Sequence, residues 1–274
     1  MLFKDPDILW IALAVNEQPQ GDCRCQVTEP IRNDSSLETE EGDHCLRVLV
    51  PPSANNSSEM SSKPQRAAFT KKELDLVGSL RTPEKVQRFL SSMPYNWESD
   101  GGTLRSFREV LKRKEAHCLE AALVATVLLE QHGYPPLLLS LESWDKLDHV
   151  IFVFQKKGLW GSIGRSRDVG LHGRRSVFRR LRDLAWSYFD PYIDFSGRIT
   201  GYGLANLYDL GDYDWRFSPR NVWKVEEHLR VIPHRSIRSS DRRYEKWAQR
   251  YKEFKKQHPD KRPAYYDNRQ HWLR

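Results

Sequence analysis

Apolar residues are concentrated after residue 70, in short runs that are separated by turn-forming residues. Thr82-Pro83-Glu84 is typical of a helix start, because Thr is a good N-cap and Pro fits the first helical position. Apolar residues then recur at helical spacing until Pro94. A second short helix is expected from Ser106, where apolar residues again share one face. The pattern therefore predicts helices in the first part of the ordered chain.

The stretch from Cys118 to Gln131 is apolar on nearly all sides of a helix. A helix of this kind is buried rather than lying on the surface. Gly133 supplies a C-terminal cap, and Pro135-Pro136 prevents the helix from continuing. The sequence therefore predicts a buried central helix over residues 118–131.

Three short strands are expected after this helix. Leu137 to Leu141 is an apolar run of strand length, and His149 to Phe154 is rich in β-branched and aromatic residues. Gln155 to Gly158 is typical of a hairpin turn, after which Leu159 to Ile163 returns antiparallel. We therefore expect an α+β fold, in which a helical N-terminal half packs against a small antiparallel sheet.

The remaining chain is more polar. An arginine-rich loop is expected from Gly164 to Arg175, followed by a helix from Val177 to Phe189 that Pro191 ends. Residues Ser240 to Gln257 are predicted to form an amphipathic helix, because their aromatic residues recur at helical spacing.

Charge is distributed unevenly along the chain. Residues 1–70 contain 6 Lys+Arg and 11 Asp+Glu, whereas the whole chain has a net charge of +7, so the remainder carries +12. The polar composition of residues 16–70 buries too little apolar surface to offset the loss of chain entropy. We therefore expect an acidic, largely disordered leader over 1–70, a core domain over 71–215 and a basic helical tail over 216–274.

The composition also indicates the compartment in which the protein is expected. The apolar run from Ile8 to Val15 has eight residues, whereas a membrane span needs about 20. Four cysteines are too few for a disulfide scaffold in a chain of 274 residues. We expect a cytoplasmic protein with reduced thiols that does not bind a membrane.

Cys118 is the first candidate for chemistry. A cysteine in an apolar helix is usually a core residue, but Cys118 lies where the helix begins and follows the basic stretch Lys112 to His117. Free N–H groups, the helix dipole and nearby cations all favour a thiolate there. His149 opens an apolar strand, so its ring can reach the end of a neighbouring helix. A nucleophile and a base that are close in space but distant in sequence are typical of a cysteine hydrolase.

The order of these elements resembles the papain-like superfamily, and the chain is similar to bacterial members of its transglutaminase-like branch. The matching stretches include Glu115 to Ala122, Asp148-His149-Val150 and Gly158 to Gly161, within residues 75–215. This resemblance implies a cysteine hydrolase or acyltransferase that acts on peptide or amide bonds of a peptide or protein through a thioester. It also implies an oxyanion donor near Tyr95-Asn96-Trp97, and it implies no metal or cofactor.

The chain departs from this family at Gly164. An Asp usually lies four residues beyond the Trp of the return strand, and Trp160 plus four is Gly164. If the strand continues, Ser166 and Asp168 are substitutes for the missing acid, because alternate strand residues share a face. Asp190 is a third candidate.

A second hypothesis follows from this departure. A degenerate member of the fold would bind an acidic ligand through the arginine-rich region from Arg165 to Arg182. A solvated loop is the alternative explanation of the same charges.

Nucleic acid is not expected as a partner, since the basic tail lacks a known motif. His117 is expected to be structural, because neighbouring helical residues do not face each other. Zinc binding is not expected either, although Cys23, Cys25, His44 and Cys45 offer possible ligands.

Overall fold

Four α-helices precede the sheet in the computed structural model, which describes residues 63–146, 148–194, 197–261, 263 and 268–273. They are α1 (Lys71–Ser79), α2 (Pro83–Ser92), α3 (Phe107–Arg113) and α4 (Cys118–Glu130). The side chains of Thr70, Thr82 and Ser106 cap α1, α2 and α3 by accepting a backbone N–H of the first turn. The helices predicted from Thr82, Ser106 and Cys118 are therefore confirmed.

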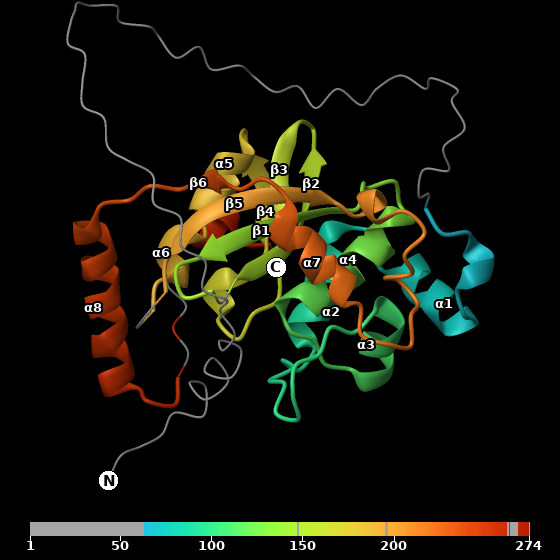
Figure 1. Cartoon of the computed structure of the whole chain (residues 1–274), viewed down its shortest axis with the longest axis horizontal. Helices are drawn as coiled ribbons and strands as arrows, with labels where there is room; N and C mark the ends of the chain where they lie inside the picture. Colours follow the sequence, from blue (N-terminus) through green and yellow to red (C-terminus); the bar gives the residue numbers. More distant parts are fainter. Residues whose placement is uncertain (1–62, 147, 195–196, 262, 264–267, 274) are drawn as a thin grey trace, which may run out of the picture. The chain divides into compact units, whose positions relative to one another are not determined.

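The strands form one antiparallel sheet in the described part of the chain, in the order β4-β3-β2-β1-β5-β6 (Figure 1). Their bounds are β1 Leu137–Ser143, β2 His149–Lys156, β3 Leu159–Ile163, β4 Arg174–Phe178, β5 Ile199–Asn206 and β6 Arg235–Ser236. The hairpin between β2 and β3 turns at Lys157 and Gly158, which both have positive φ. The predicted α+β class and the three predicted strands are confirmed.

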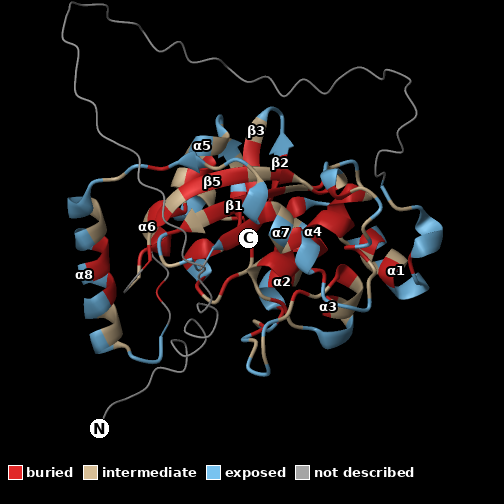
Figure 2. Cartoon of the chain, in the orientation of Figure 1, coloured by how far each residue is buried: buried red, intermediate tan, exposed pale blue. Residues whose placement is uncertain are grey.

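Both faces of the sheet are covered, so the described core has two parts (Figure 2). Phe152 and Phe154 point from β2 toward α4 and the other N-terminal helices. Ile151 and Val153 point to the opposite face, where they meet α5 (Leu181–Trp186), α6 (Phe189–Tyr192) and α8 (Asp241–Gln257). Since side chains alternate along a strand, burial of both faces explains why β2 is a continuous apolar run.

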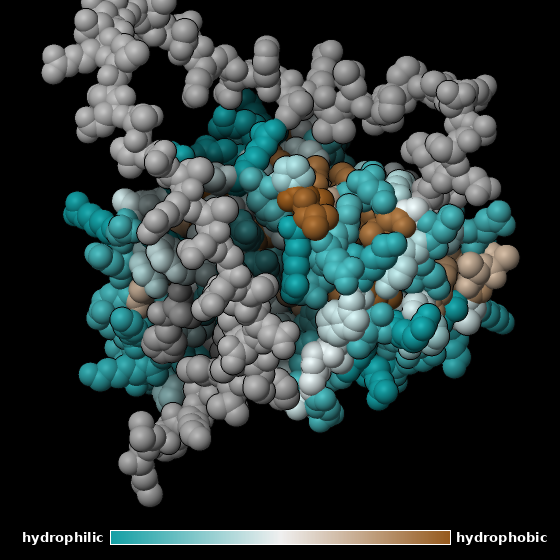
Figure 3. Space-filling model, viewed as in Figure 1, coloured by the Kyte–Doolittle hydropathy of each residue, from teal (hydrophilic) through white to brown (hydrophobic). Residues whose placement is uncertain are grey.

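The C-terminal segment packs against this core. Trp247 and Tyr251 of α8 are buried, as the amphipathic pattern predicts, while α7 (Trp223–Val231) covers β5 on the other side. Figure 1 shows α8 at one end of the sheet and α1 at the other. Where grey atoms do not cover it, the face drawn in Figure 3 is mainly hydrophilic, with hydrophobic side chains gathered in small patches.

The helix predicted from Val177 to Phe189 is partly wrong. Residues Arg174 to Phe178 form β4, which pairs with β3 through Ser162↔Arg174 and Trp160↔Phe178. The helix α5 begins at Leu181, because the chain first completes this edge strand. The sequence pattern also gave no indication of β5, β6 or α7.

The N-terminal leader and its zinc candidates, Cys23, Cys25, His44 and Cys45, lie outside the described residues except for residues 63–70. The division at residues 215 and 216 stays a prediction. None of the described helices combines the length and apolar character needed to cross a bilayer.

Candidate active site

Cys118 is the first residue of α4, and its side chain is partly buried. The N-cap is His117, whose Nδ1 accepts the Leu119 N–H at 3.2 Å and whose Nε2 lies 2.9 Å from the carbonyl oxygen of Thr103. This cap holds His117 in the loop before the helix, but the ring also acts on the neighbouring thiol. Burial lowers the pKa of His117, whereas a hydrogen bond with Cys118 and the charge of Glu120 outweigh burial and raise that pKa to about 9. The expectation of a purely structural role is therefore not met. The Cys118 thiol lies at the positive end of the α4 dipole, where a thiolate is favoured.

Glu120 fixes the loop that leads to this helix end. Its side chain is fully buried, and its carboxylate accepts hydrogen bonds from the His117 N–H at 3.1 Å and the Arg105 N–H at 3.0 Å. Thr103 Oγ1 and Asn96 Nδ2 also donate to it, at 2.9 and 3.0 Å. Four donors compensate the cost of burying the carboxylate. Glu120 thus joins the N-cap of α4 to residues 96–105.

His149 is the first residue of β2, as predicted, and its side chain is almost fully buried. Its Nε2–H donates to the carbonyl oxygen of Leu171 at 3.0 Å. Burial raises the pKa of the Cys118 thiol, but hydrogen bonds and charge from His117 and His149 outweigh burial, so that pKa lies well below its usual range. The structure therefore brings Cys118 and His149 together, and Nδ1 is the His149 nitrogen left for the sulfur.

The acceptor for His149 does not come from a continued strand. The strand β3 ends at Ile163, and the chain turns into a 3₁₀ helix over Val169–Leu171. The condition under which Ser166 and Asp168 were candidates, a continued strand, is therefore not met. Ser166 Oγ instead accepts the Asp168 N–H at 3.3 Å, and a carboxylate oxygen of Asp168 lies 3.9 Å from Arg167.

Gly164 lies where the resemblance leads one to expect an Asp. A Cβ added there would lie 2.8 Å from Ile151 Cγ2, 3.2 Å from the Leu171 oxygen and 3.7 Å from His149 Nε2. The first two distances are shorter than ordinary van der Waals contacts. The space that a side chain would need is therefore filled by Ile151 of β2 and by the Leu171 carbonyl.

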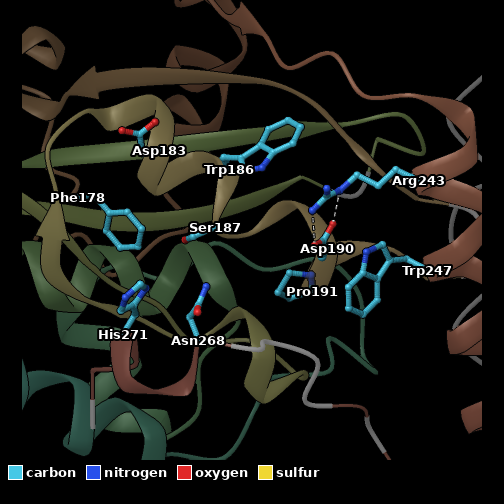
Figure 4. Close-up of a pocket in the computed structure, with 10 residues that line it drawn as sticks. All are labelled: Phe178, Asp183, Trp186, Ser187, Asp190, Pro191, Arg243, Trp247, Asn268 and His271. Atoms are coloured by element: carbon cyan, nitrogen blue, oxygen red, sulfur yellow. Dashed lines mark hydrogen bonds and ion pairs between the residues drawn. The ribbon is translucent and has the colours of Figure 1, made fainter.

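Asp190, the third candidate acid, belongs to another part of the surface. Its carboxylate accepts two hydrogen bonds from Arg243 of α8, at 2.8 and 2.5 Å. The pair borders a hollow of about 250 Å³, lined also by Phe178, Trp186 and Trp247 (Figure 4). Asp190 therefore anchors α8 rather than orienting His149.

The segment Tyr95-Asn96-Trp97, which was predicted to supply an oxyanion donor, contains residues with two different roles. The Asn96 amide is buried and donates to Glu120 and Thr103, so it supports the loop. Burial, followed by the charge of Cys118, raises the pKa of Tyr95, so that its hydroxyl keeps its proton at neutral pH. Arg165 lies over the Tyr95 ring at 5.6 Å, and the Trp97 ring packs against it at 5.0 Å.

The arginine-rich region does not form one surface. Arg174 is fully buried, and Arg165 donates to the carbonyl oxygen of Met93 at the end of α2. Arg167 lies 3.7 Å from a carboxylate oxygen of Asp194. The exposed members are Arg175, Arg179, Arg180 and Arg182. The hypothesis that the Arg165–Arg182 region binds an acidic ligand stays untested.

Within the described residues, no group of three or more His, Cys, Asp and Glu side chains is arranged to hold a metal ion. Sequence reasoning missed Leu171, because a backbone carbonyl has no signature in the sequence. The one indication in the sequence was Gly164: because the expected Asp is missing there, His149 needs another hydrogen-bond acceptor.

Comparisons with known proteins give little further information. No family model matches the chain, and no curated protein matches it. Among solved structures, the chain is similar to Legionella pneumophila LapG in an EGTA-treated form, with 15% identity and a TM-score of 0.31. The match covers 51% of this chain and 81% of that one. At this TM-score, the likeness carries no argument about the site.

Proposed function

We propose that this chain is a transglutaminase-like cysteine hydrolase or acyltransferase, with Cys118 as the nucleophile and His149 as its base. The observation that carries the proposal is geometric: Cys118 opens α4 with its sulfur 4.0 Å from the carbonyl oxygen of Asp148, the residue before His149, and Nε2 of His149 is bound to Leu171. The lowered pKa of the Cys118 thiol supports it. A thiolate rather than a thiol is the nucleophile in such reactions.

In the proposed first step, the S–H bond of Cys118 breaks and its proton moves to Nδ1 of His149. The thiolate then attacks a carbonyl carbon, and its C=O electrons move to oxygen. The backbone N–H of Cys118 is available to this oxyanion, because the first N–H groups of a helix have no intrahelical acceptor. The Tyr95 hydroxyl, which keeps its proton and feels the charge of Cys118, is the proposed second donor.

When the tetrahedral intermediate collapses, the leaving amine takes the proton from His149 and a thioester remains on Cys118. His149 then takes a proton from water or from an acceptor amine, which attacks the thioester. Water gives a carboxylic acid, and an amine gives a new amide. Both outcomes return the thiol and the neutral imidazole.

A peptide or protein substrate is supported by the surface beside Tyr95. The indole of Trp97 is 53% exposed and packs edge-on against the Tyr95 ring. An exposed aromatic side chain that packs against Tyr95 provides a surface for an apolar side chain of a substrate.

The direct test is to trap the thioester. The full-length protein would be mixed with p-nitrophenyl acetate and with a library of peptide amides, quenched in acid and analysed by intact mass spectrometry. We expect one acyl group on Cys118, which is absent in Cys118→Ser and strongly reduced in His149→Ala. The control is His132→Ala, because His132 lies beyond the other end of α4, where its Nε2 is 2.8 Å from the Val77 carbonyl oxygen. No acylation by any acyl donor would refute the proposal.

A further inference from the structure

Arg174 is the most unusual residue near the site, because its charged side chain is fully buried. It begins β4, where its backbone N–H donates to Ser162 Oγ at 3.0 Å. Its guanidinium donates to the carbonyl oxygens of Gly170 and His172, each at 2.6 Å, and lies 4.3 Å from the centre of the Tyr188 ring. Buried charges are retained where they are hydrogen-bonded and have a role, so the role of this one requires an explanation.

The two carbonyls that Arg174 holds are the neighbours of Leu171 in the sequence. The Leu171 carbonyl between them accepts the Nε2–H of His149 at 3.0 Å. Three successive carbonyls are therefore all engaged, the outer two by one guanidinium and the middle one by the imidazole. The Leu171 N–H is also fixed, since it donates to the Asp168 carbonyl at 3.0 Å.

The other end of the same loop is held by Gln87 of α2, whose side chain is fully buried. Its amide accepts the Gly164 N–H at 3.0 Å and donates to the Gly164 carbonyl at 2.9 Å. This pair of hydrogen bonds holds Gly164 against α2. The segment from Gly164 to Arg174 is thus fixed at both ends, with Leu171 directed at His149.

We propose that Arg174 is a positioning residue that presents the Leu171 carbonyl to His149 in place of the missing acid. The inference rests on the proposed function of Cys118 and His149. A carbonyl oxygen can only accept a hydrogen bond, so it keeps the proton of a neutral His149 on Nε2. Nδ1 is then the basic nitrogen and takes the Cys118 proton, while the bond from Nε2–H to Leu171 stays in place.

The chemistry of the side chain explains why Arg occupies this position. A guanidinium has five N–H donors in a rigid fork, which suits two carbonyls that are two residues apart. A lysine has a single ammonium on a flexible stem and holds both carbonyls less rigidly. Arg174→Lys therefore keeps the charge but loosens the loop that carries Leu171.

The test compares Arg174→Lys with wild type in the full-length protein, with Cys23, Cys25 and Cys45 changed to Ser. Two properties would be measured: the tautomer of neutral His149, from ¹⁵N chemical shifts of labelled histidine, and the rate of Cys118 alkylation by iodoacetamide between pH 5 and 10. We expect wild type to carry its proton on Nε2, and Arg174→Lys to show a mixture. Alkylation of the variant at pH 6 should be slower by about tenfold, the effect of roughly one pKa unit in the thiol, with little change at pH 10.

Arg216→Lys is the matched control. Arg216 is also buried, but its guanidinium pairs with Glu130 at the far end of α4, at 2.6 and 3.0 Å. This change should lower stability without altering the tautomer or the pH profile. If Arg174→Lys does not fold, Tyr188→Phe replaces it, because that change removes the hydroxyl that donates to the His172 carbonyl at 3.1 Å and keeps the ring beneath Arg174. Tyr188→Phe should likewise give a mixture of His149 tautomers and slower alkylation of Cys118 at pH 6.

The outcomes separate this inference from the proposed function. If wild-type Cys118 titrates like a free thiol, the proposed function fails and the inference fails with it. If wild-type Cys118 is reactive at low pH but the variant keeps the same tautomer and profile, the positioning role of Arg174 is overturned and the proposed function stands.

Discussion

Gly164 lies against the ring of His149: a Cβ added at Gly164 would be 3.7 Å from Nε2. The same Cβ would be only 3.2 Å from the carbonyl oxygen of Leu171, which is the hydrogen-bond acceptor of that nitrogen. A side chain at Gly164 and the Leu171 carbonyl therefore compete for one space. This competition explains how the site is built without an acid at that position, and it leads to the first prediction.

Gly164→Asp is expected to impair the site rather than to restore a triad. The new side chain would be forced into Ile151 and Leu171, and overpacking of this kind costs about 1–3 kcal/mol. The Leu171 carbonyl would have to move away from His149, so alkylation of Cys118 at pH 6 should slow. A urea titration and the alkylation rate measure both effects. A variant that is as stable as wild type and more reactive would contradict this account.

The sequence was sufficient for the elements that carry Cys118 and His149. A stretch that is apolar all round has no stable place except the core, which explains the prediction of α4. His149 was identifiable because a polar residue before an apolar strand marks the strand's end.

The sequence was insufficient for the acceptor of His149 and for Arg174. The acceptor is a backbone atom, so residue type does not reveal it. Arg174 belongs to a run of arginines that suggests a solvated surface, and its burial depends on β4, which pairs with a distant strand. Local patterns do not contain this pairing.

Glu120→Gln should destabilise the protein by about 2–4 kcal/mol. Glu120 accepts from four donors, and a glutamine amide group would direct N–H toward some of them, which leaves buried polar groups unsatisfied. The free energy of unfolding from urea titration measures this loss. Glu226→Gln is the control, because its i,i+4 pair with the exposed Arg230 contributes about 0.5 kcal/mol or less. Equal effects of the two changes would contradict the role of Glu120.

Tyr95→Phe should separate acylation from alkylation. Removal of one oxyanion donor costs about 10²–10³ in rate, whereas alkylation by iodoacetamide forms no oxyanion. We therefore expect slower acylation of Cys118 by p-nitrophenyl acetate and a much smaller change in alkylation. If both rates fall equally, Tyr95 acts on the thiol itself rather than on the oxyanion.

Stability should fall in acid because of His172. Burial, together with the charges of Arg165, His149 and Arg174, lowers the pKa of His172 to about 4, although a hydrogen bond to the Ser166 carbonyl opposes this. An unfolded histidine titrates near a pKa of about 6.5. Between these values the unfolded chain binds a proton that the folded protein does not bind, so the stability at neutral pH is progressively lost as the pH falls from about 6.5 to about 4.

The contribution of His172 is isolated by comparing wild type with His172→Asn. The free energy of unfolding would be measured at pH 7 and pH 5, where one such group changes it by up to about 1.4 kcal/mol per pH unit. We expect the difference between the two pH values to be smaller in the variant. An unchanged difference would mean that His172 takes up its proton equally in both states.

The central claim is that Cys118 and His149 form a reactive pair. The most direct measurement is the rate of Cys118 alkylation by iodoacetamide as a function of pH, in a background with Cys23, Cys25 and Cys45 changed to Ser, with and without His149→Ala. The account predicts a rate that persists well below the free-thiol pKa of about 8.5 and that falls at low pH in His149→Ala, to the level that the remaining effect of His117 sets. A Cys118 that is inert, or that titrates like a free thiol whichever residue occupies position 149, would contradict it.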